Sequence, residues 1–202
     1  MKIAFYYVDA NYINYLKQKE IEYRGFTTVP NIEYKGKGSK PKFVCGVVME
    51  LVKEDNTKMN YYVPVSSFHE SKEDNIVVKI ESTIKEEKEG QVTKRKIVQA
   101  VASLRFNYMF PVPKSCLKKV DFQDRTVYSE EDSRFLDKEY RYIKNKIRIT
   151  NLQKQAQKTY KNVLSARDKK LLQNSCVFEI LEKACLEYIK RQNNKEFNNE
   201  DN

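Results

Sequence analysis

The segment KFVCGVVMELVKEDNTKMNYYVPVSS, residues 42–67, decides the fold of this chain. Two apolar runs flank a polar stretch around Asp55 that has the composition of a turn. This order predicts a β-hairpin, because antiparallel pairing around a turn sets the first residues of one strand beside the last of the other. A turn centred near Asp55 pairs Lys42 with roughly position 68, within one or two residues of register.

The open end of this hairpin gathers side chains that can hold a phosphate. Lys42 begins the first strand, and Ser66, Ser67 and His69 stand at the end of the second. A cation, hydroxyls and an imidazole on one rim suit an anion, and the favoured anion is an RNA phosphate. The alternative is that these are ordinary polar strand ends that face water.

The charge of the chain favours a polyanionic partner. Its 202 residues carry a net charge of +10, with a pI near 9.2. A basic surface attracts nucleic acid first and an anionic membrane second. The alternative is a soluble protein that is merely rich in lysine. The hydrophobic content of 40% argues against wholesale disorder and allows a packed core.

Several classes of protein and site are not expected. No run reaches the roughly 18 apolar residues of a membrane helix, and Asp9 interrupts the first apolar run, so neither a membrane span nor a secretory signal is predicted. We expect a cytoplasmic protein with free thiols. Because the cysteines lack CxxC spacing and there is a single histidine, neither a metal site nor a cofactor is predicted. The cysteines are Cys45, Cys116, Cys176 and Cys185.

The hydrophobic pattern predicts an α+β fold with a mostly antiparallel sheet. Period-two and helical patterns indicate a single domain over residues 1–190, with a β-rich core in about 1–125, helices in about 129–190 and a polar, frayed tail at 191–202. The predicted β-rich part has a strand at 3–8, a helix at 10–20, the hairpin, and strands at 76–84 and about 96–110 around a charged turn at 85–90. The predicted helical part runs from Ser129 to about 163. A last helix begins between 168 and 175 and ends near 190.

The segment YKGKGSK, residues 34–40, has the composition of an RNA-binding loop. Lysines suit phosphates, glycines allow close approach of the backbone, and an aromatic ring can stack on a base. The segment does not fit the phosphate-loop pattern GxxxxGK[ST], so nucleotide hydrolysis is not indicated. The candidate RNA-binding residues are Tyr34, Lys35, Lys37 and Lys40, together with His69.

Common catalytic constellations are missing from the chain. It has no pair of histidines and no dense acidic cluster for two-metal chemistry. Ser67 and His69 stand at i and i+2, which rarely orients a catalytic triad. What remains is metal-free cleavage of RNA, in which the substrate's 2′-hydroxyl is the nucleophile. Such a protein must hold the phosphate in line and offset its growing charge.

Three short stretches carry a resemblance to a known family. They are VDANYINYLK at 8–17, PKFVCGVVME at 41–50 and YVPVSS at 62–67. In this order and spacing, the chain resembles the type III toxin–antitoxin endoribonucleases. These are the ToxN-like and AbiQ-like toxins of abortive infection and phage resistance, and the AbiQ branch is the most similar.

The resemblance implies a fold, an activity and partners. The fold is a compact antiparallel β core with helices, similar to the Kid/MazF-like toxins. The activity is sequence-specific RNA cleavage without metal, leaving a 2′,3′-cyclic phosphate. A small repetitive pseudoknot antitoxin RNA inhibits such toxins, is cut from its own precursor by them, and can join them in higher-order assemblies. Cellular or phage RNA is the other expected substrate, and neither DNA nor a membrane is expected as a partner.

The resemblance also implies site residues. The family's catalytic lysine falls on Lys42, its Thr-Ser pair on Ser66 and Ser67, with Ser67 the stronger candidate, and its helix tyrosine on Tyr12. Gly38 stands about where ToxN-like toxins have a tyrosine, for which Tyr34 is a possible substitute. The segment after Ser67 is also shorter than in ToxN-like toxins. The general base stays open among Ser67, His69, a tyrosine and the substrate itself.

Two rival functions remain beside the endoribonuclease. A non-catalytic RNA-binding module would bind RNA with steep salt dependence and leave it intact. A structural interaction protein would have only incidental charge and would purify free of nucleic acid.

Overall fold

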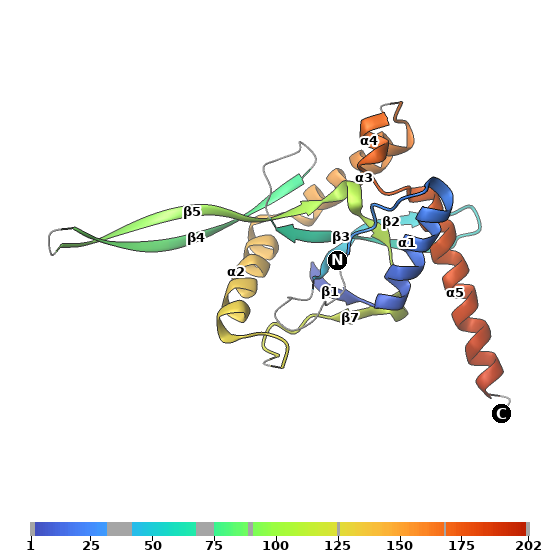
Figure 1. Cartoon of the computed structure of the whole chain (residues 1–202), viewed down its shortest axis with the longest axis horizontal. Helices are drawn as coiled ribbons and strands as arrows, with labels where there is room; N and C mark the ends of the chain where they lie inside the picture. The colour runs from blue at the N-terminus through green and yellow to red at the C-terminus, as the bar shows by residue number, and fades with distance from the viewer. Residues whose placement is uncertain are drawn as a thin grey trace.

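The computed structural model describes residues 3–31, 42–67, 75–88, 91–124, 126–167 and 169–200. In these ranges the fold is α+β, with a seven-stranded antiparallel sheet in the order β4-β5-β3-β2-β1-β7 and β6 paired with β3 (Figure 1). The strands are β1 (Ala4–Val8), β2 (Val44–Val52), β3 (Lys58–Ser67), β4 (Asn75–Lys88), β5 (Gln91–Arg105), β6 (Phe110–Pro111) and β7 (Leu117–Lys119). The helices are α1 (Ala10–Arg24), α2 (Glu130–Lys146), α3 (Ile149–Leu164), α4 (Lys169–Gln173) and α5 (Phe178–Glu200), with single 3₁₀ turns η1 (Phe106–Tyr108) and η2 (Lys114–Cys116).

The predicted hairpin is present as β2 and β3, but its register changes along its length. Near the turn, Val52 pairs with Lys58 and Met49 with Tyr61; beyond an irregularity between Gly46 and Met49, Gly46 pairs with Tyr62. The irregularity inserts two extra residues of β2. The register at the open end is therefore displaced by two positions from the one that the turn alone predicts.

Helix α1 follows β1 and has a defined cap at each end. The carboxylate of Asp9 accepts a hydrogen bond from the Tyr12 backbone N–H at 3.0 Å and so caps the N-terminus of the helix. Gly25 ends the helix with φ 82°, a left-handed conformation that suits glycine, and its N–H donates to the Ile21 carbonyl. The helix is four residues longer than predicted and lies beside α5 (Figure 1).

Strands β4 and β5 form a long two-stranded arm. Figure 1 shows the two strands running together away from the rest of the molecule. They extend to Lys88 and from Gln91, so the prediction of a charged turn over residues 85–90 is wrong for the residues that pair. The charged run at 85–88 misled the prediction because charge is typical of turns, whereas a solvent-exposed ribbon also accommodates it.

The helical part begins and divides close to the predicted positions. The Ser129 hydroxyl accepts a hydrogen bond from the Asp132 N–H at 3.1 Å and caps α2, which begins where a helix was predicted. Helix α5 continues to Glu200, past the predicted end of the last helix near 190. That prediction followed the apolar pattern, which stops near Tyr188, whereas the helix continues past its packed face. No helix in the described ranges is long and apolar enough to span a membrane.

An aromatic cluster holds the open end of the hairpin in place. The Phe43 ring lies 4.9 Å from Phe5 and 5.7 Å from Phe122, measured between ring centroids, and Phe5 lies 5.2 Å from Tyr140 of α2. Phe43 is only 5% exposed. Because Phe43 directly follows Lys42, burial of its ring fixes the backbone next to that lysine.

Candidate active site

The structure brings Lys42 and Ser66 to one end of the sheet. Val44 pairs with Pro64, and the Phe43 carbonyl accepts a hydrogen bond from the Val65 N–H at 3.2 Å. Continuing this register places Lys42 across from Ser66. Lys42 is exposed and Ser66 is half-buried, so both lie at the solvent boundary. The two-residue displacement in β2 explains why the partner of Lys42 is position 66 and not position 68.

The register distinguishes the two serines. Ser66 pairs with Ser103 of β5, and Ser67 pairs with Ala102. Directly paired residues share a face of a sheet, and successive residues alternate between faces. Lys42, Ser66 and Ser103 therefore share one face across three strands, while Ser67 belongs to the other. The geometry favours Ser66 as the companion of Lys42, although the sequence favoured Ser67.

Strand β5 adds two polar residues to this edge that the sequence reading missed. Ser103 is 1% exposed, and its hydroxyl has no hydrogen-bond partner. The buried Nε of Arg105 also has none, and its guanidinium lies 5.8 Å from the centre of the Tyr108 ring. An unpaired buried polar group costs about 1–3 kcal/mol. The sequence signal was present as two polar residues alternating with apolar ones at the end of an apolar strand.

Tyr12 does not belong to this rim. Its side chain is 0% exposed, and its hydroxyl donates to the Pro111 carbonyl at 2.7 Å. Burial raises its pKa well above that of an ordinary tyrosine. Tyr12 shares the buried face of α1 with Ile13 and Leu16, which explains its position. Its expected contact with substrate is therefore corrected to a role in the core.

Six predicted site residues lie partly or wholly beyond what the structure describes. Ser67 is placed by its backbone alone, as the last residue of β3. The others fall outside the described ranges, and they are Tyr34, Lys35, Lys37, Lys40 and His69.

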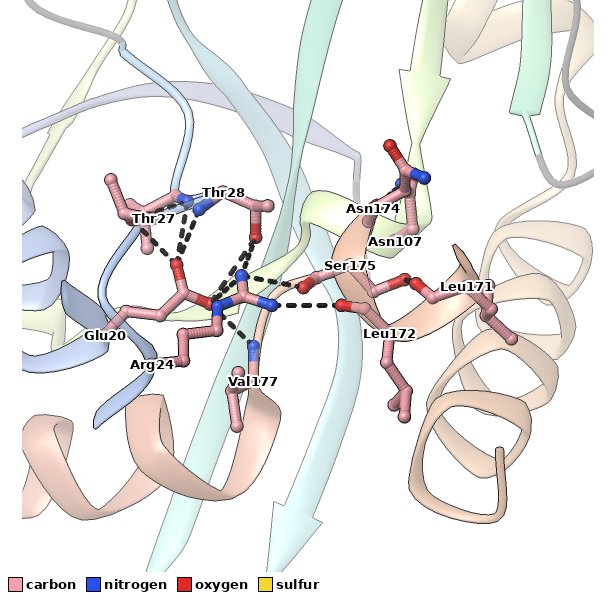
Figure 2. Close-up of polar contacts among 11 residues, drawn as sticks. Glu20, Arg24, Thr27, Thr28, Asn107, Leu171, Leu172, Asn174, Ser175 and Val177 are labelled. Atoms are coloured by element: carbon pink, nitrogen blue, oxygen red, sulfur yellow. Dashed lines mark hydrogen bonds and ion pairs between the residues drawn. The ribbon is translucent and has the colours of Figure 1, made fainter. Parts of the chain in front are cut away.

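A buried carboxylate fixes the segment that follows α1. Glu20 is 0% exposed and accepts hydrogen bonds from the backbone N–H groups of Thr28 at 2.7 Å, Val29 at 3.2 Å and Val177 at 2.8 Å (Figure 2). Arg24 neutralises it with a guanidinium nitrogen at 2.8 Å. Backbone N–H groups from two separate stretches, residues 28–29 and Val177, thus converge on one anion, which Arg24 also pairs.

Arg24 extends this network to the segment between α4 and α5. Its guanidinium donates to the carbonyls of Leu172 at 3.0 Å and Ser175 at 3.1 Å (Figure 2). The network joins α1, the segment at 27–29 and the start of α5. Its hydrogen bonds hold structural elements together, although the buried Nε of Arg24, like that of Arg105, has no hydrogen-bond partner.

The cysteines are not available as nucleophiles. All four are buried and free. Burial raises the pKa of the Cys45 thiol to about 12 and those of Cys116 and Cys185 to about 11, so these thiols stay protonated at neutral pH. Among the described residues, no group of three or more histidines, cysteines or carboxylates is placed to hold a metal ion.

Comparisons with known structures agree on the fold. A toxin inhibited by a non-coding RNA pseudoknot shares 22% identity, with a TM-score of 0.62 over 93% of this chain and 98% of that one. AbiQ, a lactococcal anti-phage endoribonuclease of the type III toxin–antitoxin class, shares 21%, with a TM-score of 0.62 over 94% and 99%. A protein from a bacterial antiviral system regulated by a processed non-coding RNA shares 20%, with a TM-score of 0.58 over 91% and 96%.

The family assignment rests on a separate comparison. No curated protein sequence matches the chain. A family model described as "Toxin ToxN, type III toxin-antitoxin system" matches residues 4–186, which is nearly the whole chain. The chain therefore belongs to the ToxN family of type III toxin–antitoxin toxins.

Proposed function

We propose that this protein is an endoribonuclease toxin of a type III toxin–antitoxin system that acts in phage defence. The observation that carries the proposal is the placement of Lys42 across from Ser66 at the open end of the hairpin, in a chain of the ToxN family. One structure of similar fold, AbiQ, is an anti-phage endoribonuclease. The proposed active site thus has a cation and a hydroxyl on one solvent-facing edge.

The proposed reaction uses the RNA itself as the nucleophile. The 2′-oxygen attacks the adjacent phosphorus, the bond from phosphorus to the 5′-oxygen breaks, and the products carry a 2′,3′-cyclic phosphate and a 5′-hydroxyl. The 2′-hydroxyl gives up a proton and the leaving oxygen takes one. The Lys42 ammonium offsets the charge that grows on the phosphoryl oxygens, and the Ser66 hydroxyl donates a hydrogen bond to them. In this scheme no step is assigned to a metal ion or cofactor.

The proton-transfer groups are assigned only as a set of candidates. Ser67, His69, a tyrosine other than Tyr12 and the substrate remain candidates for the general base, while Tyr12 is excluded because its hydroxyl is buried and bonded to a backbone carbonyl. Tyr34, Lys35, Lys37 and Lys40 remain proposed RNA contacts by composition. The group that protonates the leaving oxygen has the same candidates.

The proposed partner is a small repetitive antitoxin RNA. One structure of similar fold is a toxin selectively inhibited by a non-coding RNA pseudoknot, and the net charge of +10 suits such a ligand. We propose that this RNA inhibits the toxin, that its precursor is a substrate, and that cellular or phage RNA is the target of the free enzyme in the cytoplasm. RNA-mediated assembly of several toxin copies is part of the same proposal.

Incubation with the repetitive precursor RNA in excess EDTA tests the activity. We expect cleavage between repeats, with 5′-hydroxyl ends that polynucleotide kinase labels directly and 3′ ends that resist labelling by RNA ligase until the cyclic phosphate is opened and removed. Lys42→Ala should abolish the products. Intact RNA with the unmodified protein, or normal cleavage by Lys42→Ala, would show that the proposed activity or its site is wrong.

A non-catalytic RNA-binding module is the second candidate. The basic charge and the exposed Lys42 support it, because phosphate binding needs no chemistry. It predicts that the protein shifts the same RNA on a gel at low salt and leaves its length unchanged in the absence and presence of added Mg²⁺.

A further inference from the structure

The β4–β5 arm begins beside the candidate active site. Ser66 pairs with Ser103 at the base of β5, and Ser67 with Ala102. From Ala100 outward, β5 pairs with β4 alone in the described part of the chain. Figure 1 shows this ribbon leaving the body of the molecule. A two-stranded ribbon is only marginally stable in water by itself, so a projecting one calls for a function.

Strand β5 carries a basic triplet on this arm. Lys94, Arg95 and Lys96 are consecutive, and all three are exposed. Successive strand residues point to opposite faces, so the triplet offers cations on both faces of the ribbon. Lys96 lies seven residues along β5 from Ser103, which is about 23 Å at roughly 3.3 Å per residue. The triplet is therefore a separate surface that is continuous with the rim.

The pairing of the arm leaves this charge without direct partners across the ribbon. Arg95 pairs with Ile84 and Lys96 with Thr83, while Lys94 pairs with another lysine, Lys85. The exposed Glu81 of β4 pairs with Val98, so it lies diagonal to Lys96 and not directly opposite it. The triplet therefore has no carboxylate directly opposite it in the pairing, and the phosphates of a polyanion would neutralise its charge.

We propose that the arm is a second RNA-contact surface, on which Lys94, Arg95 and Lys96 bind phosphates of the RNA that enters the Lys42–Ser66 site. This inference rests on the proposed function and extends it by about 23 Å along the RNA. Phosphates along one strand of a duplex repeat roughly every 3.4 Å, so the arm reaches about seven phosphates beyond the rim. A short RNA occupies the rim alone, and a long RNA occupies both surfaces.

Binding of RNA of two lengths tests the proposal. The probes are fluorescein-labelled 2′-O-methyl-uridine oligonucleotides of about 30 and about four nucleotides, whose blocked 2′-oxygen prevents cleavage. The variant is Lys94→Gln/Arg95→Gln/Lys96→Gln in the full chain. Loss of three phosphate contacts should lower the slope of log affinity against log salt by about 2 for the long probe, because each contact in a single strand contributes roughly 0.7. Affinity for the short probe should stay the same.

A variant that removes the same charge elsewhere on the surface distinguishes RNA binding by the arm from an effect of the net charge. Lys154, Lys158 and Lys161 are exposed on α3, so Lys154→Gln/Lys158→Gln/Lys161→Gln removes the same charge. We expect this variant to keep the slope. Equal losses in both variants, or an unchanged slope in the arm variant with a native circular dichroism spectrum, would overturn the proposal. A change in sedimentation of the RNA-free arm variant, with an unchanged slope, would instead assign the arm to self-association and also overturn it.

Cleavage measured in parallel distinguishes this proposal from the proposed function. If the unmodified protein cuts the precursor RNA and the arm variant keeps its salt slope, the arm proposal fails and the endoribonuclease stands. If no cleavage occurs and the slope falls, the arm binds RNA in a protein that does not cut it.

Discussion

The two ends of the β2–β3 hairpin differ in how their charged groups are held, although a buried polar atom without a partner lies near each end, Asn60 Oδ1 towards the turn and the Ser103 hydroxyl at the open end. At the turn end, Glu182 is 2% exposed and accepts hydrogen bonds from Tyr61 at 2.7 Å and Tyr160 at 2.6 Å, and Lys53 pairs with it. At the open end, Lys42 is exposed and the Ser103 hydroxyl has no partner. The turn end joins the hairpin to α3 and α5, whereas the open end keeps polar groups that stabilise nothing in the fold. This difference indicates a structural end and a binding end.

The largest expected effect is on cleavage at the open end. Lys42→Ala should slow RNA cleavage by about 10²–10³-fold, because one electrostatic contact to a transition-state oxyanion contributes about 2.7–4 kcal/mol. The free energy of unfolding should change by less than about 0.5 kcal/mol, because the side chain is exposed. Single-turnover cleavage and urea denaturation measure the two effects.

Lys58→Ala is the matched control at the other end of the same hairpin. Lys58 is 65% exposed and forms only a long contact of 3.4 Å with Glu50. We expect cleavage within about twofold of the unmodified protein, since a surface pair of this kind contributes little. Comparable losses of cleavage in both variants would remove the distinction between the two ends.

The next largest effect is on stability at the turn end. Glu182→Ala should lower the free energy of unfolding by about 3 kcal/mol, because it leaves the buried Tyr61 hydroxyl without an acceptor and Lys53 without its partner. Urea denaturation measures this, with the exposed neighbour Glu179→Ala as the control. A loss below about 1 kcal/mol would contradict the structural role of this end.

The two serines should differ in a smaller way. Ser66→Ala should slow cleavage about tenfold or more, since a hydrogen bond to a charged group contributes about 1.5 kcal/mol or more. Ser67→Ala should change it by less than about threefold, because register places Ser67 on the other face. If Ser67→Ala slowed cleavage more than Ser66→Ala in the same single-turnover assay, Ser67 would again be the favoured active-site serine.

The smallest effect is expected at Tyr12. Tyr12→Phe removes the hydrogen bond to the Pro111 carbonyl and should cost about 1 kcal/mol of stability. Cleavage by the folded protein should be unchanged below the denaturation midpoint. A tenfold loss of cleavage with an unchanged urea midpoint would show that Tyr12 acts in the active site.

Much of this fold could be predicted from short-range patterns. The hairpin, the cap of α1 at Asp9 and the cap of α2 at Ser129 all depend on residues close in sequence, and all three are present. The displaced register of β2 could not be predicted, because an irregularity at Gly46 depends on how both strands pack. The length of the arm was also missed, because charge at 85–88 fits a turn and an exposed strand equally well.

Part of the site could also be predicted from residues that lie close together in the sequence. Lys42 and Ser66 come together through one local hairpin, so their meeting follows from the sequence. Ser103 joins them only through the pairing of β3 with β5, which are separated by the whole of β4. Tyr12 was assigned by resemblance, yet its direction depends on which face of α1 the core covers. Whether such residues belong to the site depends on strand pairing between distant segments and on which side chains are buried.

A double-mutant cycle on RNA cleavage tests the central claim, that Lys42 and Ser66 act on one phosphate. Single-turnover rates are measured for Lys42→Ala, Ser66→Ala and the double variant, with folding checked by urea denaturation. Residues that act as a unit are not additive. We predict that the double variant is within about threefold of Lys42→Ala. Two independent losses that multiply in the double variant, or no loss in either single variant, would contradict the account.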